Sequence, residues 1–427
     1  MYNQATEKPS KYSVIVAIDW ADRKHDLRIR YRDEEKTLTL VNNLPKLNEF
    51  FLDLLAENQW QKIAVVIEST QSALMHLLHS ISQFDLFAVH PATASSYART
   101  FSPSGAKNDT SDTASLMDLF IKHPEKIRLY NIEKHSSILN CYNEKRRYAV
   151  DDRTKFGNQL TSLLKKYYPV ALQVNGDHIY SPLSIDFLMK WSSPQKLLQA
   201  NKQQLKYFFN KRTSKKSTTP IRLEILESTM VVVEDLSLTE MYETELLDLL
   251  RRIVALNESI KIYETKIQRC YQANDDYEVF NSFPGAGKAL GPRVMAFFGN
   301  NRSRFNDVGE ALAYSEIAPV LQESGNMSIT RRRYRCSKFR QQTFIEFAEG
   351  TRKTSVWAQE FYKQKKLQGK SHFTILRALA FKWIRIIYKC WMDQEPYDEN
   401  RYLEALRKFG SPLVDNTSIT TLKKLTA

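Results

Sequence analysis

The run Val14-Ile-Val-Ala-Ile18-Asp19 decides the fold of the N-terminal part of this chain. Its consecutive apolar residues indicate a strand that is covered on both faces, and the run Ile63-Ala-Val-Val-Ile67-Glu68 repeats the pattern. Each run ends at a carboxylate, and a charge at the end of a buried strand is costly unless a cation lies near it. The two runs therefore predict strands of a layered α/β domain whose carboxylates, Asp19 and Glu68, meet a cation.

The residues around these runs alternate between strand and helix patterns. Alternating polar and apolar residues predict further strands, and apolar residues three and four apart predict helices. The alternation places residues 11–125 in one α/β domain. The expected additional strands are 27–31, 36–41 and 86–89, and the expected helices are 47–55, 71–81, one that Pro91 opens, and 112–121.

A pair of carboxylates, Asp109 and Asp112, follows in the stretch Lys107-Asn-Asp-Thr-Ser-Asp112. At positions i and i+3 of a helix start they share one face, and the helix N-terminus favours negative charge. Such a pair alone is most often a helix cap. Together with the two strand-end carboxylates it predicts a site for a hard cation, Mg²⁺ or Mn²⁺, which prefers oxygen ligands and supports phosphodiester chemistry.

The charge of the chain points to a polyanionic partner. It has 427 residues, with 62 Lys and Arg against 48 Asp and Glu, for a net charge of +14. Nucleic acid is favoured over an anionic membrane because no basic amphipathic anchor is present, and a merely basic protein is the remaining alternative. No uncharged apolar run reaches 18 residues, so we expect no membrane span.

The cysteines and the N-terminus bear on location. Cys141, Cys270, Cys336 and Cys390 form no Cys-x-x-Cys pair, which disfavours a zinc site or a disulfide framework. The first residues contain no hydrophobic signal region. These features predict a protein of the reducing cytoplasm.

Four further regions are expected after residue 125. Residues 126–222 are helical and basic, and Arg146, Arg147 and Arg153 are candidates for phosphate contacts. Residues 223–275 contain a heptad seam, which predicts either a helix packed on its own core or a coiled-coil arm that joins subunits. Residues 276–395 read as a compact helical domain and 396–427 as a polar, peripheral tail. The seam residues are Leu246, Leu249, Ile253, Leu256, Ile260, Tyr263 and Ile267.

The run Phe283-Pro-Gly-Ala-Gly-Lys288 resembles a phosphate loop only superficially. It lacks the earlier glycine of a Walker motif, and Ala289 stands where Ser or Thr is needed. A helix-hairpin-helix turn fits better, with Gly285, Gly287 and Lys288 approaching a DNA phosphate. A plain helix–helix turn is the alternative.

Ser324 lies in Gln322-Glu-Ser-Gly325, ahead of a basic segment. A serine hydroxyl needs placement and neutralised phosphate charge to act as a nucleophile, and nearby arginines supply the latter. From spacing alone Ser324 is a weak candidate. The basic residues that follow it are Arg331, Arg332, Arg333, Arg335, Lys338 and Arg340; Lys107 is a further candidate for a phosphate contact.

Taken in order, these motifs resemble the DEDD transposases of the insertion-sequence-110 family, the bridge-RNA-guided recombinases. The motifs that carry the resemblance are Ala17-Ile-Asp19, Ile67-Glu68, Lys107–Asp112, Arg153-Thr, Asn158, Pro284–Gly287, Arg304-Phe305, Ala313-Tyr314, Ala318-Pro319 and Glu323-Ser-Gly325. The chain departs from the family pattern at Thr113, where alanine is usual, at Glu323, where glutamine is common, and in the arginine-rich segment containing Cys336.

The resemblance implies a RuvC-like (RNase H-like) N-terminal domain whose DEDD carboxylates are Asp19, Glu68, Asp109 and Asp112. It also implies a mostly helical C-terminal transposase domain with Ser324 as the catalytic serine. The implied partners are double-stranded donor and target DNA and a structured non-coding guide RNA. The implied assembly is a homo-oligomer, a dimer or a tetramer on DNA, in a bacterial or archaeal cytoplasm near the nucleoid. The heptad helix would then be the inter-subunit arm.

The resulting prediction is an RNA-guided DNA recombinase that cuts and rejoins strands for the mobility of an insertion sequence. One alternative is a metal-dependent nuclease or Holliday-junction resolvase, with the same carboxylates but water as nucleophile. Another is a non-catalytic protein that keeps the fold to package RNA.

Overall fold

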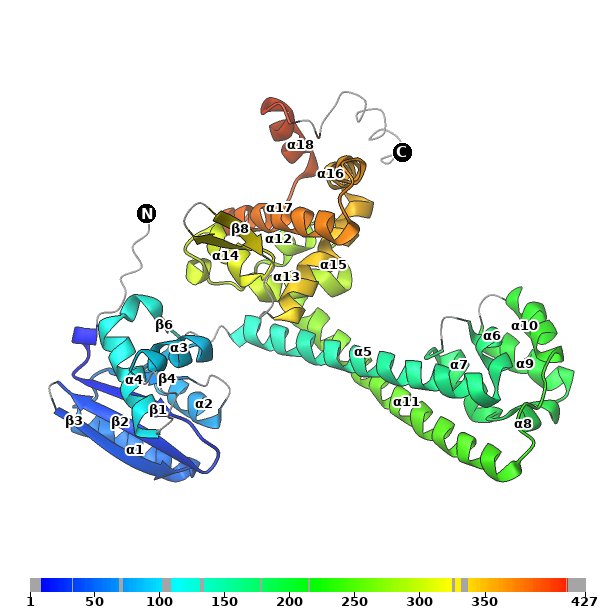
Figure 1. Ribbon diagram of the computed structural model, residues 1–427, viewed down its shortest axis with the longest axis horizontal. Coiled ribbons are helices and arrows are strands. Elements are labelled where there is room, and N and C mark those ends of the chain that lie inside the picture. Colours follow the sequence, from blue (N-terminus) through cyan, green and yellow to red (C-terminus); the bar gives the residue numbers. More distant parts are fainter. Residues whose placement is uncertain are drawn as a thin grey trace. The chain divides into compact units, whose positions relative to one another are not determined.

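The computed structural model describes residues 9–32, 34–68, 72–101, 109–130, 134–176, 179–213, 216–324, 327–331, 337–411 and 413. The chain divides into two compact units, 1–132 and 133–427. Each is described by itself below, with the elements labelled as in Figure 1.

The first unit is built on a six-stranded sheet of order β3-β2-β1-β4-β5-β6. The strands β1, β4 and β5 are parallel, and β2, β3 and β6 pair antiparallel with their neighbours. The mixed sheet confirms the expected α/β layering. Its strands are β1 (Val14–Asp19), β2 (Lys24–Tyr31), β3 (Glu34–Val41), β4 (Ile63–Ile67), β5 (Phe84–Ala88) and β6 (Arg128–Leu129). Because β6 lies after residue 125, this unit extends slightly beyond the expected boundary.

Alternate residues of the central strands feed two cores. Val16 and Ile18 pack toward α1 (Leu44–Glu57) and α2 (Ala73–His79), whereas Ile15 and Ala17 pack toward α4 (Asp109–Lys122). Side chains alternate across a strand, so a strand buried on both sides must be apolar throughout, as the β1 run is. A further helix, α3 (Pro91–Phe101), adds Tyr97 to the α4 side, and short 3-10 turns lie at Pro9–Lys11 and Pro124–Lys126.

A long antiparallel helix pair, α5 (Lys134–Tyr167) and α11 (Leu236–Gln272), runs through the second unit (Figure 1). Its direction follows from the cross-links between the helices, since Arg146 pairs with Glu264 and Arg153 with Asn257. Short helices cover one end of the pair and form a core with it. They are α6 (Pro169–Asn175), α7 (Pro182–Lys190), α8 (Pro194–Leu198), α9 (Lys202–Arg212) and α10 (Thr218–Glu227).

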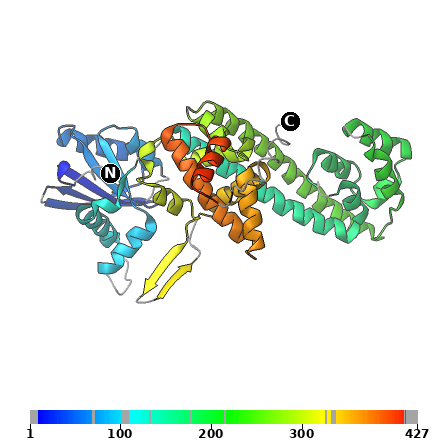
Figure 2. The same ribbon diagram turned by 90° about the horizontal axis from the view of Figure 1, so that it is seen from above.

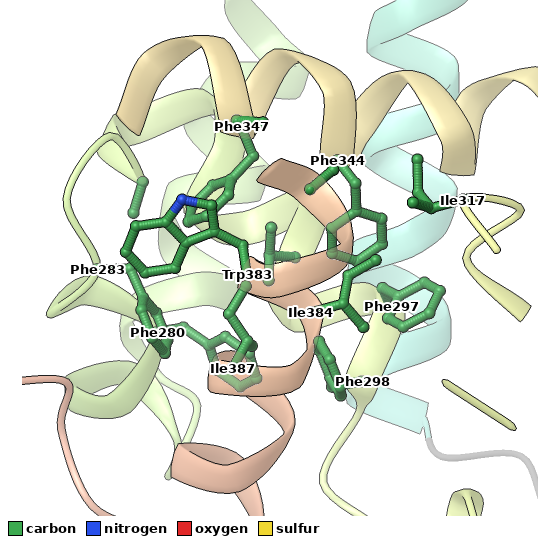
Figure 3. Close-up of a cluster of buried hydrophobic side chains, with 14 of the residues drawn as sticks. Phe280, Phe283, Phe297, Phe298, Ile317, Phe344, Phe347, Trp383, Ile384 and Ile387 are labelled. Atoms are coloured by element: carbon green, nitrogen blue, oxygen red, sulfur yellow. The ribbon is translucent and has the colours of Figure 1, made fainter. Parts of the chain in front are cut away.

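The C-terminal part of the second unit surrounds an aromatic core (Figure 3). Trp383 of α17 (His372–Asp393) is fully buried there and packs edge-on against Phe283 and Phe347. The elements are α12 (Tyr277–Asn281), α13 (Gly287–Phe298), the 3-10 turn Arg302–Arg304, α14 (Val308–Tyr314), β7 (Val320–Ser324), β8 (Met327–Arg331), α15 (Lys338–Thr354), α16 (Val356–Leu367), α17 (His372–Asp393) and α18 (Glu399–Lys408).

The heptad seam packs within the chain. Leu246, Leu249 and Ile253 are buried in one core with Leu160, Leu163 and Leu164 of α5, and Ile267 is buried in the aromatic core. The interpretation of the seam as an inter-subunit arm was therefore wrong for these residues, because α5 of the same chain covers them. A seam at heptad spacing specifies a partner helix but does not say from which chain it comes.

The expected polar tail begins later than residue 396. Tyr397 stacks on Phe283, and its hydroxyl accepts a hydrogen bond from the indole nitrogen of Trp357 at 2.9 Å. Leu403 of α18 is buried in the same core. A few apolar residues in a polar segment are enough to anchor one amphipathic helix, which charge content alone did not predict.

Candidate active site

Asp19 and Glu68 lie at the same edge of the sheet. The parallel strands β1 and β4 are in register from Ile15 beside Ala64 to Ile18 beside Ile67. Asp19 and Glu68 are the next residues along the chain in each case, so this register places their backbones side by side. Both are partly exposed, whereas the strand residues that precede them are buried. Carboxyl ends of adjacent parallel strands are a common position for ligands in α/β folds.

The helix that carries the aspartate pair packs on these strands. α4 begins at Asp109 and runs antiparallel to β1, because the ring of Phe120 near its end lies 6.5 Å from that of Tyr12, which precedes β1. Its first turn is therefore directed toward the edge where Asp19 lies. The side chain of Asp112 is partly exposed and that of the next residue, Thr113, is buried. The side chain of Asp109 lies outside the described part of the structure.

A polar contact ties α4 to α3. The hydroxyl of Tyr97 on α3 donates to the carboxylate of Asp118 at 2.7 Å, and Lys122 pairs with the same carboxylate at 2.9 Å. Burial and this hydrogen bond raise the pKa of Tyr97 to about 12, so the hydroxyl stays a donor throughout the physiological range. Asp118 therefore positions a helix.

The donor set suits a hard cation, since all four predicted ligands are carboxylates. Among the described side chains, which include Asp19, Glu68 and Asp112 but not Asp109, no three His, Cys, Asp or Glu residues lie close enough to hold a metal ion. The alignment of two strand ends and a helix start brings the predicted ligands to one edge. The metal site itself stays a prediction.

Ser324 is the last residue of β7, in a two-stranded hairpin (Figure 2). Its backbone pairs with Met327 of β8, and β8 ends at Arg331. The structure therefore places the backbone of Ser324 at the end of a strand. The candidates Arg332, Arg333 and Arg335 lie outside the described residues, as does Lys107.

The glycine-rich turn joins α12 to α13, and its two glycines differ. Gly285 has φ +79°, and a Cβ atom there would lie 2.9 Å from backbone atoms of Gly350 and Thr351 in α15. Gly287 has φ +52°, with no atom within 4 Å of such a Cβ. The absence of a side chain at Gly285 thus allows close packing against α15. A glycine at this position is therefore no longer an argument for a phosphate contact there. Gly287 and the exposed Lys288 remain candidates.

Three arginines predicted to contact nucleic acid tie helices together. Arg146 pairs with Glu264 of α11 at 2.6 Å. Arg147 pairs with Asp151 of its own helix at 2.7 Å and with Glu346 of α15 at 3.6 Å. The guanidinium of Arg153 donates to Asn257 at 3.0 Å and lies 4.6 Å from the ring centre of Tyr180. These contacts give the three residues a structural role, and a phosphate would have to compete with their present partners.

Two basic residues at the start of α15, Lys338 and Arg340, differ in their surroundings. Arg340 pairs with Glu316 at 3.1 Å and lies over the ring of Tyr314 at 4.1 Å. Lys338 is exposed at the first position of α15. Of the two, Lys338 is better placed to contact a phosphate. A separate set of cations along α17 was missed from the sequence, because its spacing is visible only once the buried face of that helix is known.

Comparison with known proteins identifies the family. A model of the DEDD transposases of IS110, described as a transposase, matches residues 16–169, and a model described as "Transposase IS116/IS110/IS902 family" matches residues 277–363. The chain belongs to the IS110 family of transposases. It is therefore an enzyme that acts on DNA, and the recognition of this family from its motifs is confirmed.

Individual relatives agree with this family. The chain is 26% identical over 407 residues to the candidate mini-circle transposase for IS117 of Streptomyces coelicolor, covering 92% of this chain and 97% of the relative. It is 23% identical over 366 residues to a 44.8 kDa protein of the insertion element IS116 of Streptomyces clavuligerus, covering 85% and 87%. It is 21% identical over 229 residues to a 42 kDa protein of IS900 of Mycobacterium paratuberculosis, covering 53% and 57%.

The two family matches include every predicted catalytic residue. The first spans the four carboxylates and α5, and the second spans the glycine turn and Ser324. None of the helices in the described part of this IS110-family chain is long and apolar enough to cross a membrane.

Proposed function

We propose that this IS110-family transposase is an RNA-guided recombinase that cleaves and rejoins DNA with a serine nucleophile and a carboxylate metal site. The observation that carries the proposal is the register of β1 and β4, which aligns Asp19 with Glu68 at the edge toward which the first turn of α4 is directed. The order of the sheet, with antiparallel β3-β2-β1 followed by parallel β4 and β5, supports a RuvC-like assignment of this domain.

Asp19, Glu68, Asp109 and Asp112 would hold Mg²⁺ or Mn²⁺. When bound, such an ion offsets negative charge on a phosphodiester and orients it. The carboxylates alone would repel a DNA phosphate, so their proposed role depends on the cation. The start of α4 lowers the cost of gathering these charges because a helix N-terminus carries partial positive charge.

Ser324 would act on the phosphorus of the DNA strand. Its Oγ forms a bond to phosphorus as the bond to the 3′-oxygen of the leaving strand breaks. The hydroxyl proton leaves Oγ, and the released 3′-oxygen takes up a proton. A later attack by a 3′-hydroxyl reverses these steps and rejoins the strand. The backbone of Ser324 pairs with Met327 of β8, which supports a fixed position for this residue.

The proposed partners are donor and target duplex DNA, a structured guide RNA and further copies of this chain. The net charge of +14 favours binding of a polyanion. Since the carboxylates and Ser324 lie in different compact units, the two halves of the site could come from one subunit or from two. We propose that they come from two, in a dimer that assembles further on DNA.

Mixing two inactive variants tests this proposal. Asp112→Ala and Ser324→Ala should each form no covalent protein–DNA adduct alone. If carboxylates of one subunit serve the serine of another, mixed oligomers contain an intact composite site, and adduct formation should return. A variant carrying both changes is the matched control and should rescue neither partner. No rescue in mixtures that form mixed oligomers would contradict the shared site.

The alternative of a metal-dependent nuclease or junction resolvase makes a different prediction for the same proteins. With water as nucleophile, Ser324→Ala would cleave DNA at a rate close to that of the parent, without any adduct. Co-purification and sequencing of bound RNA tests the guide separately, because a single structured RNA species is expected and a random mixture would contradict it.

A further inference from the structure

A cavity of about 1040 Å³ runs along α17 in the C-terminal part of the second unit. The buried face of α17 includes Leu379, Trp383 and Ile387, and the opposite face lines the cavity with residues again spaced by three and four. The other walls come from Phe361 of α16, from the start of α18 and from Ile317 and Pro319. Nothing in the proposed chemistry uses this groove.

At one end of the groove, among the described residues, two cationic side chains lie without carboxylate partners. Lys382 and Arg385 line it, and in the described part of the chain neither has a carboxylate within ion-pairing distance. Burial, followed by repulsion from Arg385 and Lys365, lowers the pKa of Lys382. At the other end Lys389 and Arg401 are already paired, with Asp393 and Glu395. A bound anion at the first end would relieve the repulsion.

Aromatic side chains lie beside these cations. The ammonium group of Lys382 is 5.4 Å from the ring centre of Phe361, and Phe381 and Tyr402 line the same cavity. Phe381 is half-buried, so part of its ring is accessible. Positive charge next to accessible aromatic rings is the combination that holds the backbone and the bases of an unpaired strand.

We propose that the groove along α17 binds a single-stranded stretch of nucleic acid, with phosphates at Lys382 and Arg385 and a base against Phe381. Duplex is disfavoured because its paired bases offer no free face to the ring. Unpaired DNA and unpaired RNA both offer phosphates and free base faces, so either could occupy the groove, and the experiment below distinguishes them.

The groove also has a direction. Ile317 and Pro319 form part of its wall, and the chain continues from them directly into β7, which ends at Ser324. A strand held in the groove is thus next to the base of the hairpin that carries Ser324. This step rests on the proposed function. The binding itself does not, since it can be measured without cleavage.

The test uses the full-length protein and short oligonucleotides. Fluorescence anisotropy with labelled eight-nucleotide DNA and RNA strands measures affinity at several salt concentrations. Lys382→Gln with Arg385→Gln removes two phosphate contacts, so the slope of log K against log salt should fall by about 1.4 for single strands. Lys261→Gln with Lys266→Gln, at exposed positions of α11, removes the same charge and should leave the slope near that of the parent.

Phe381 tests the base contact. Phe381→Leu keeps an apolar side chain and removes the ring, and loss of one stacked base should weaken binding roughly 5- to 150-fold. Lys382→Arg keeps the charge and should restore the slope, which separates a lost contact from a folding defect. Ultraviolet cross-linking of 5-iodouracil strands should label the peptide containing Phe381, and the stronger label identifies DNA or RNA as the ligand.

Two results would overturn the proposal. One is an unchanged salt slope in the Lys382 and Arg385 double variant, with cross-links elsewhere in the chain. The other is binding of blunt duplex at least as tight as binding of single strands. If single strands bind in the groove but Ser324→Ala still recombines DNA, only the proposed chemistry is refuted, because binding in the groove does not require Ser324.

Discussion

Truncation of Ile253 tests how the long helix pair is held together. This side chain on α11 is fully buried and shares a core with Leu160, Leu163 and Leu164 of α5. Ile253→Ala removes its outer carbons from a packed site, and such changes cost about 2–5 kcal/mol, from lost burial and from the cavity left behind. The covering helix belongs to the same chain, so this cost should appear in the free energy of unfolding of the chain itself. We expect a loss of about 3 kcal/mol.

The matched control is Ile262→Ala on the same helix. Ile262 is 58% exposed, so its truncation should change the free energy of unfolding by no more than about 0.5 kcal/mol. Urea unfolding followed by circular dichroism measures both variants, at two protein concentrations tenfold apart. The midpoint for Ile253→Ala should fall equally at both.

Light scattering on the same samples distinguishes an intrachain seam from an inter-subunit one. The mass of the Ile253→Ala particle should equal that of the parent. A smaller particle, with an unfolding midpoint that depends on protein concentration, would refute the intrachain seam and restore the subunit-joining interpretation.

Three further predictions follow from single contacts. Gly285→Ala should destabilise the protein by more than Gly287→Ala in thermal melts, because both have positive φ, worth about 1–2 kcal/mol, but only Gly285 also meets the backbone of α15; equal losses would contradict the close packing. Burial alone would raise the pKa of Glu243, but hydrogen bonds from Lys196, Ser193 and Ser192 lower this pKa on balance. The ionised carboxylate therefore stabilises the fold at pH values above the pKa of the unfolded state, and this stabilisation is lost as the pH falls through the pKa of the folded state. Glu243→Gln should therefore be less stable than the parent at pH 7 and converge with it in acid, and a constant gap across pH would exclude this linkage. Asp19→Asn and Asp112→Asn should abolish Mg²⁺-dependent strand cleavage while the far-ultraviolet circular dichroism spectrum is retained, and normal cleavage by either would remove it from the ligand set.

The first unit could be predicted well because its signals are local. The apolar runs before Asp19 and Glu68 each became a strand covered on both faces, and the register of these strands placed the two carboxylates together. The family, too, followed from short motifs in a fixed order, because such motifs record the residues that a shared chemistry requires.

The errors concern partners that are distant in sequence. The seam of α11 required an apolar helix opposite it, and nothing in its spacing identified α5, about 100 residues earlier, as that helix. Arg146 and Arg153, which stay predicted phosphate contacts, also bind Glu264 and Asn257 on α11, and the sequence did not reveal these partners. The groove of α17 was missed because only the fold shows which of its faces remains uncovered. Charge and periodicity predict faces, and tertiary structure decides what covers them.

The most direct test of the central claim is the covalent bond to Ser324. A suicide DNA substrate, nicked near the crossover so that the released end diffuses away, traps any adduct of the parent protein. Denaturing gels followed by mass spectrometry of the linked peptide should place a phosphodiester on Ser324, only when Mg²⁺ is present and all four carboxylates are intact. Ser324→Ala should form neither adduct nor recombinant product while still binding DNA. Recombination by Ser324→Ala, or an adduct on another residue, would contradict the serine mechanism.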